Sequence, residues 1–191
     1  MKKRKRFTEG CVVKVPLGDG THSYGLILPM GQVTFYDIRT DKDIEISDII
    51  SSKRLFTIGV MKFVLSPSKS VWEIVGKIEL TDGHRDLPKK AIQDIMNYQN
   101  IKMYDVYTGE ATPATYEEVK ELEPVAGWEH EHIVERLTAH FDGRRSLMME
   151  AESLKDPSVY LNWVHYFETK GKYLAEELGA TPAQEKEGGV E

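Results

Sequence analysis

The stretch from residue 7 to residue 29 constrains the fold of this chain more than any other. Two short runs of β-branched and aliphatic residues, 11–15 and 24–28, flank a segment that holds Pro16, Gly18, Asp19 and Gly20. Asp-Gly is a strong signal for a hairpin turn, and proline lacks the backbone donor that the middle of a strand needs. The sequence therefore predicts that the chain opens with a β-hairpin.

The first strand of this hairpin has two different faces. Val13 and Val15 point to one side and Val12 and Lys14 to the other, because successive side chains of a strand alternate. We expect one side to pack on a core while the other keeps a solvated lysine.

Further short strands follow along the first half of the chain. Residues 32–39, 71–80 and 101–107 alternate in polarity, and the apolar segment 55–65 ends at Ser66-Pro67-Ser68. Short strands separated by turns are typical of a strongly curved antiparallel sheet or a small barrel. A short helix is expected over residues 89–98, after Pro88.

Helical signals dominate the second half. Thr115 and Glu118 have the spacing of a capping box, which predicts a short helix to residue 122. Residues 129–141 form the best amphipathic pattern, with apolar positions at Ile133, Val134, Leu137 and Phe141. Gly143 lies just beyond as a stop signal. The fold class is therefore α+β, with helices from the C-terminal half packed on a sheet from the N-terminal half.

Two more helices are expected after Gly143. One runs through Met148 and Leu154, and the next begins at Asp156-Pro157, with an aromatic-rich stripe at Val159, Trp163, Tyr166 or Phe167, Leu174 and Leu178. This stripe needs a partner surface. The simplest expectation is that it docks on the core of the same chain, and a dimer or partner contact is the alternative.

Charge is unevenly distributed along the chain. Residues 2–6 supply five of the 25 Lys and Arg and no acid, so the remainder holds 20 bases against 31 acids, a formal charge of −11. The basic start is interpreted as a flexible solvated arm, with a nucleic-acid-binding arm as the alternative. The acidic body argues against nucleic acid as the main ligand and suits a basic protein partner.

Neither a membrane nor a disulfide is indicated. No apolar run approaches the ~18 residues of a membrane span, and the basic start does not lead into the apolar segment of a signal peptide. The single cysteine, Cys11, excludes an internal disulfide and is expected to be a buried structural thiol. The expected compartment is the cytoplasm.

Several motifs in this order resemble the immunity protein 26 family. They span roughly residues 4–143 and comprise Phe7, Glu9-Gly10, the turn at 16–20, Tyr24-Gly25, the strand Trp72-Glu73-Ile74-Val75-Gly76, Pro88, Leu122-Glu123, Trp128 and Glu135-Arg136-Leu137. The chain departs from the family at Cys11, where an acidic residue is common, and after about residue 145. We therefore expect an arm at 1–6, an immunity-type α+β domain at 7–143, a helical extension at 144–179 and a disordered tail at 180–191.

The resemblance implies a cytoplasmic, non-catalytic protein that binds and neutralises the toxin domain of a bacterial polymorphic toxin system. The expected partner is one cognate toxin domain, and no cofactor is expected. Because some family members are linked to phosphotriesterase activity, a metal-dependent hydrolase is the alternative. The oligomeric state is left open.

Residues that a hydrolase would need are sparse. His130 and His132 stand two positions apart and so do not face each other on a helix, and His140 is two turns further along. Asp82, His84 and Asp86 lie in a polar loop, which is interpreted as a turn; a cation-binding or acid–base site is the alternative. No metal site and no catalytic residue is therefore predicted.

Two groups of carboxylates are the candidates for toxin binding. Delivered toxins include nucleases with basic clefts, and an acidic inhibitor blocks such a cleft with carboxylates placed where phosphates bind. The alternative for both groups is an ordinary solvated face. The candidates are Asp41, Asp43 and Glu45 at a turn, and Glu129, Glu131 and Glu135 on the amphipathic helix.

Overall fold

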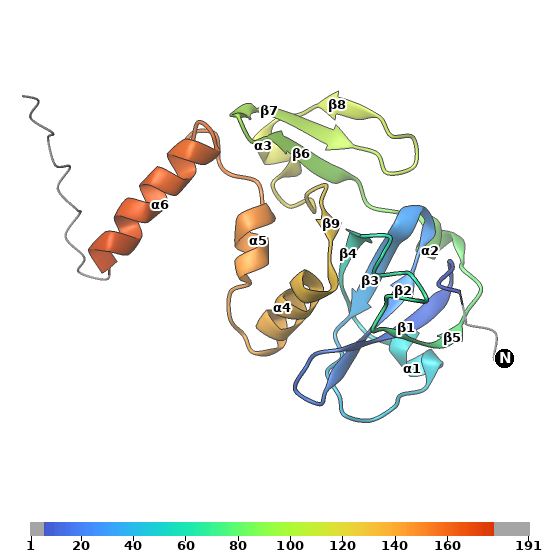
Figure 1. Ribbon diagram of the computed structural model, residues 1–191. Helices are drawn as coiled ribbons and strands as arrows, with labels where there is room; N and C mark the ends of the chain where they lie inside the picture. Colours follow the sequence, from blue (N-terminus) through green and yellow to red (C-terminus); the bar gives the residue numbers. More distant parts are fainter. Residues whose placement is uncertain (1–5, 178–191) are drawn as a thin grey trace, which may run out of the picture.

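The computed structural model describes residues 6–177 and has an α+β fold with two sheets (Figure 1). The larger sheet has six strands in the order β5-β1-β2-β3-β4-β9. Their bounds are β1 Cys11–Pro16, β2 His22–Ile27, β3 Gln32–Tyr36, β4 Arg54–Val60, β5 Glu73–Lys77 and β9 Gly127–Trp128. The strands up to β5 pair antiparallel, as the sequence predicts.

The predicted opening hairpin is confirmed as β1 and β2. Val13 lies opposite Gly25, and β1 ends at Pro16. Gly18 and Gly20 in the turn have φ values of +89° and +87°, a conformation that glycine adopts without steric cost. The local turn signal therefore sets the register of the first two strands.

The six-stranded sheet is open and mixed within the described residues, so it is a curved sheet and not a closed barrel. Its last strand, β9, runs parallel to β4, with Val60 opposite Trp128. A parallel neighbour needs a long crossover, and residues 61–126 supply it. The expectation of a purely antiparallel sheet is wrong at this edge.

Both faces of this sheet are covered. Val13, Val15 and Phe35 pack on one face with Ile133 and Leu137 of α4 (His130–Phe141). On the other face, a second cluster unites apolar residues of the sheet with Ile49 of α1 (Ile46–Ser51) and with Leu80; the sheet residues are Val12, Tyr24, Leu26 and Tyr36.

The second face of the first strand is therefore also covered, although its lysine stays partly exposed. Val12 is fully buried while Lys14 beside it is half-buried. No local pattern predicts α1, a short helix whose main stabilisation is this packing.

The prediction of a helix over residues 89–98 is wrong, because most of these residues belong to the smaller sheet. Those residues form a hairpin of β6 (Lys90–Asp94) and β7 (Asn97–Tyr104), and β8 (Ala111–Pro113) pairs with β7. The backbone of Ala91 explains the error. Its N–H donates to Glu123 O and its carbonyl accepts from Val125 N, so tertiary pairing outweighs local helical preference.

Two short helices carry capping boxes. In α3 (Tyr116–Val119) the predicted box is confirmed, since Thr115 N donates to Glu118 Oε2 at 2.7 Å, although the helix ends three residues earlier than expected. The polar loop at 82–86 is instead a one-turn helix, α2 (Asp82–Arg85), because His84 accepts from the backbone N–H of Thr81.

The last two helices are α5 (Leu147–Glu152) and α6 (Trp163–Glu177). Helix α6 begins seven residues later than Asp156, because Leu161 O and Trp163 N are bonded to the β6–β7 hairpin. Figure 1 shows α6 running away from the six-stranded sheet. The expected arm, apart from Arg6, and the expected tail at 180–191 lie outside the described residues. No helix in the described part of the chain is long and apolar enough to cross a membrane.

Candidate partner-binding surfaces

The first acidic group lies on the turn before α1. Backbone bonds between His22 and Thr40, and a bond from Ile44 N to the Tyr24 hydroxyl at 3.3 Å, hold this turn against β2. Asp43 accepts from Lys14 Nζ at 2.7 Å, and this hydrogen bond lowers the pKa of the Asp43 carboxyl. Asp43 is therefore partly neutralised by its neighbour.

The other two carboxylates of this group are more available. Asp41 and Glu45 are exposed, and neither has an ion-pair partner among the described residues. They present negative charge to solvent beside the Lys14–Asp43 pair.

The second group begins α4, where Glu129 is the N-cap residue and Glu131 lies exposed in the first turn. Trp72 Nε1 donates to His130 Nδ1 at 2.9 Å, and burial lowers the pKa of the His130 imidazole. This bond fixes the start of α4 against the loop before β5.

Exposed apolar side chains surround the start of α4. Met61 N donates to Trp128 O, which places the loop after β4 directly beside Glu129. Met61 and Phe63 in that loop, and Val71 next to Trp72, are all exposed. An apolar centre with charged residues at its edge is the usual anatomy of a protein-binding surface. The sequence carries no signal for this grouping, because exposure of an apolar side chain is decided by tertiary packing.

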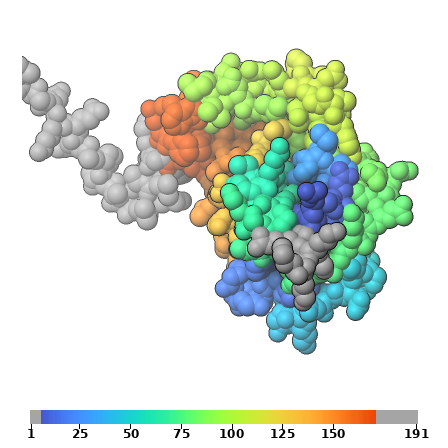
Figure 2. All heavy atoms as spheres, turned by 45° about the vertical axis from the view of Figure 1, so that its right-hand side comes forward, coloured from blue at the N-terminus to red at the C-terminus, as the bar shows by residue number. Residues whose placement is uncertain are grey.

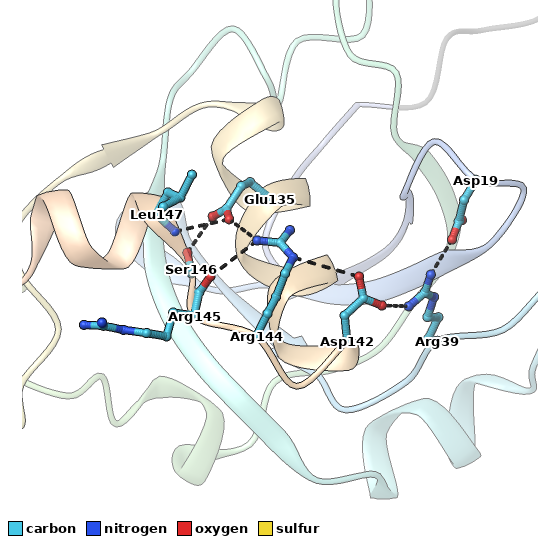
Figure 3. A network of polar contacts seen from close by, with 8 residues as sticks. All are labelled: Asp19, Arg39, Glu135, Asp142, Arg144, Arg145, Ser146 and Leu147. Carbon is cyan, nitrogen blue, oxygen red and sulfur yellow. Dashed lines mark hydrogen bonds and ion pairs between the residues drawn. The ribbon is translucent and has the colours of Figure 1, made fainter. Parts of the chain in front are cut away.

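Glu135 lies on α4 with the second group, but it is engaged inside the protein (Figure 3). Its carboxylate accepts from Arg144 Nη1 at 2.8 Å, from Ser146 Oγ at 2.5 Å and from the backbone N–H groups of Leu147 and Met148. Burial raises the pKa of Glu135, but these hydrogen bonds outweigh it, and the pKa lies below its ordinary value. Glu135 thus joins α4 to the N-terminus of α5.

A chain of ion pairs continues from this junction to the hairpin turn (Figure 3). Arg39 bridges Asp142, at the end of α4, and Asp19, in the β1–β2 turn, at 2.6 and 2.5 Å. The neighbouring Arg144 completes the connection to Glu135. These charges fix three segments that are distant in sequence, and the side chains remain partly exposed.

A basic cavity of about 390 Å³ lies between β4 and α4. Its basic side chains are Lys53, Arg54, Arg136 and Arg144, and His140 also lines it. Most are already paired: Arg136 makes two bonds to Glu123, and His140 and Lys53 both contact Asp37. Internal carboxylates therefore offset most of the positive charge in the cavity.

The histidines serve local contacts. His22 bonds the Tyr24 hydroxyl at 2.9 Å, His84 caps α2, and His140 pairs with Asp37. Within residues 6–177 no three His, Cys, Asp or Glu side chains are arranged to hold a metal ion. Cys11 is buried, as predicted, and its Sγ lies 3.5 Å from Thr8 Oγ1.

The structure does not bring the two acidic groups together. The turn before α1 accompanies the core cluster on one face of the six-stranded sheet, whereas α4 packs on the opposite face. Asp41, Glu45, Glu129 and Glu131 thus lie on two separate protein surfaces. Broad charged surfaces of this kind are suited to contact with another macromolecule.

The comparison with protein families places the chain in a defined group. A family model described as "Immunity protein 26" matches residues 8–117, and the chain belongs to the immunity protein 26 family. Membership implies an immunity protein. The match covers the opening hairpin, the strands to β8 and the start of α3, and it ends before Trp128 and α4. No curated protein and no solved structure matches the chain.

Proposed function

We propose that this protein is an immunity protein that binds the cognate toxin domain of a bacterial polymorphic toxin system and neutralises it by direct contact in the cytoplasm. The observation that carries the proposal is the family match over residues 8–117. Toxins of this kind are delivered on contact between sibling cells. The protein acts without catalysis and without a cofactor.

The acidic charge of the protein favours a basic toxin domain, such as a nuclease, as the partner. The formal charge of the whole chain is −6, and carboxylates can occupy the sites where a nuclease binds phosphates. We place the main contact at the start of α4, where Glu129 and Glu131 stand beside the exposed Met61 and Phe63. The turn with Asp41, Asp43 and Glu45 is the second candidate surface.

Calorimetric titration with the toxin domain encoded by the adjacent upstream gene tests the proposal. One-to-one binding with a nanomolar dissociation constant and loss of toxin activity is the expected result. No binding, together with zinc or manganese in the purified protein, would instead support the metal-dependent hydrolase.

Charge reversal tests which of the two acidic surfaces contacts the toxin. One variant carries Glu129→Lys and Glu131→Lys, and the second carries Asp41→Lys and Glu45→Lys. Asp43 and Glu135 are left intact because they bond Lys14 and the start of α5. A matched control reverses two other exposed carboxylates, Glu110 on the β7–β8 loop and Glu121 after α3.

Stopped-flow association rates then identify the contact. Reversal of the contacting pair should slow association by roughly tenfold or more at low salt and weaken its salt dependence. The control should associate like the unmodified protein. Rates that stay unchanged in both test variants would exclude an electrostatic contact at either surface.

A further inference from the structure

A large apolar patch at the end of the molecule distant from the turn before α1 is not used by the proposed function (Figure 1). It combines the tip of the β6–β7 hairpin with the first turns of α6 and the residues just before it. Each of its side chains is 41–64 % exposed, and we call the set the aromatic patch: Ile95, Met96, Leu161, Trp163, Val164 and Phe167.

Backbone and side-chain contacts make the patch continuous. Trp163 N donates to Ile95 O at 2.9 Å, and Trp163 Nε1 lies 3.2 Å from Met96 Sδ. The rings of Trp163 and Phe167 meet edge to face, with centroids 6.2 Å apart. Figure 2 shows the start of α6 and the β6–β7 hairpin side by side.

An adjoining face of α6 is already occupied. Tyr166 is buried, with Lys155 Nζ 4.9 Å from its ring centroid, and Lys170 contacts Glu150 of α5. Phe167 stands four residues after Trp163 and three after Val164, so it joins both of them on the exposed face. The helix is thus attached to the body by one side and leaves an aromatic side exposed.

The patch is at or above the upper end of what a typical monomer leaves exposed. Aromatic side chains bury on the order of 150–250 Å² each, and taking this size for all six side chains, about half exposed, gives an upper estimate of roughly 500–800 Å². The largest apolar patch of an ordinary monomer is about 300–600 Å², and one side of a standard protein interface is about 800 Å². The area is therefore sufficient for a specific interface.

The patch also lacks charge. Residues 95–97 and 161–167 contain no Asp, Glu, Lys or Arg, although charged residues make up 29 % of the chain. Two copies with a formal charge of −6 repel each other least when they meet through a face without charged side chains. Aromatic and methionine side chains are enriched in interfaces, and the interfaces of homodimers are the more apolar ones.

Other occupants fit this surface less well. Of the residues outside the described part, 178–191 contain only Leu178 and Val190 as large apolar residues and 1–5 contain only Met1, so neither segment has much to cover an aromatic surface. A basic toxin would gain no electrostatic attraction from an uncharged patch.

We propose that the aromatic patch is a homodimer interface, in which two copies bury Trp163, Val164 and Phe167 against each other about a twofold axis. A twofold interface uses the same residues from both partners, as an apolar, uncharged patch allows. The acidic surfaces stay exposed in this dimer. Each copy can therefore hold its own partner.

Sedimentation velocity over roughly 1–200 µM tests the proposal, since this range covers the micromolar dissociation constants of moderate interfaces. The unmodified chain should sediment with twice its monomer mass of 21.8 kDa at the upper end. Phe167→Glu and Leu161→Glu should each raise the dimer dissociation constant by roughly 30-fold or more. Met30→Glu is the matched control, because Met30 is similarly exposed but lies in the loop between β2 and β3.

Tryptophan fluorescence gives a second readout. Trp163 is the exposed one of the three tryptophans, since Trp72 and Trp128 are buried. Dilution of the unmodified protein should therefore shift its emission to longer wavelength as Trp163 becomes solvated. Phe167→Glu should show the shifted emission at every concentration, and its far-ultraviolet circular dichroism should be unchanged.

Two results would overturn the dimer. One is a monomer over the whole concentration range, and the other is a dimer that Phe167→Glu and Leu161→Glu leave intact. If the protein is monomeric and Phe167→Glu abolishes toxin binding, the patch belongs to the toxin contact. Because dimerisation is measured without toxin, the absence of a dimer would not contradict the proposed function.

Discussion

The buried amine of Lys90 should make the stability of this protein depend on pH in an unusual direction. Lys90 opens β6, is 3 % exposed, and donates through Nζ to Thr57 O of β4 at 2.5 Å. It therefore connects the small sheet to the large one. Burial lowers the pKa of Lys90 from 10.5 to about 8.

The sign of the effect follows from proton binding. Between about pH 8 and pH 10.5 the unfolded chain holds a proton on this lysine that the folded protein has released. Raising the pH therefore favours the folded state. With these two pKa values, the free energy of unfolding should rise by about 2 kcal/mol between pH 7 and pH 9.5 from this residue alone.

Lys90→Met isolates this contribution, because methionine fills a similar volume without titrating. Urea unfolding of both proteins, followed by tryptophan fluorescence, gives the free energy of unfolding at several pH values. Other groups titrate equally in both proteins, so the difference between them carries the Lys90 signal. The scan ends at pH 9.5 because burial also raises the pKa of Tyr24 and Tyr36, whose ionisation favours the unfolded state at higher pH.

The expected result is that the unmodified protein gains about 2 kcal/mol relative to Lys90→Met over this range. A difference that stays constant from pH 7 to pH 9.5 would refute the reasoning. It would mean that the Lys90 amine keeps its ordinary pKa and is solvated in the folded protein.

Three further predictions concern stability. Glu135→Ala should lower the free energy of unfolding by about 2 kcal/mol, because it removes four hydrogen bonds at the junction of α4 and α5. The control Glu131→Ala, at an exposed residue, should change the free energy of unfolding by less than about 0.5 kcal/mol. Urea unfolding measures both values. Gly25→Ala should lower the free energy of unfolding by about 1–2 kcal/mol, because the added Cβ would meet three core side chains, the nearest at 2.9 Å. Gly83→Ala is the control, because the atom nearest to its added Cβ is 4.0 Å away. Equal melting temperatures of the two variants would contradict the prediction. Burial lowers the pKa of His22, so below about pH 6.5 the unfolded chain binds more protons than the folded protein, and the folded protein loses stability as the pH falls. His22→Gln should make this loss smaller between about pH 6.5 and pH 5 in thermal melts. An unchanged dependence of melting temperature on pH would contradict this prediction.

Elements with local signals were predicted well from the sequence. The Asp19-Gly20 turn gave the first hairpin, the Thr115–Glu118 pair gave the start of α3, and the apolar spacing from Ile133 to Phe141 gave α4. In each case residues within one turn or one hairpin make the decisive contacts. A sequence window of that length contains the whole physical reason.

Elements held by distant partners were predicted wrongly or missed. Residues 89–98 form strands because Ala91 bonds the backbone of Glu123 and Val125, and α6 starts late because Trp163 N bonds Ile95 O. Helix α1 was missed because its packing partners are supplied by the far face of the sheet. Such contacts join segments far apart in sequence, and no local pattern encodes them.

The candidate surfaces show the same division. The amino-acid sequence by itself determined that the chain is acidic and where its carboxylates stand along it. Tertiary structure alone decided which of them stay available for binding, because it turned Glu135 inward to α5, paired Asp43 with Lys14, and left Glu131 exposed. The physical reason is that a charge contributes to binding only where folding leaves it solvated and uncompensated, and compensation comes from residues brought near by the fold.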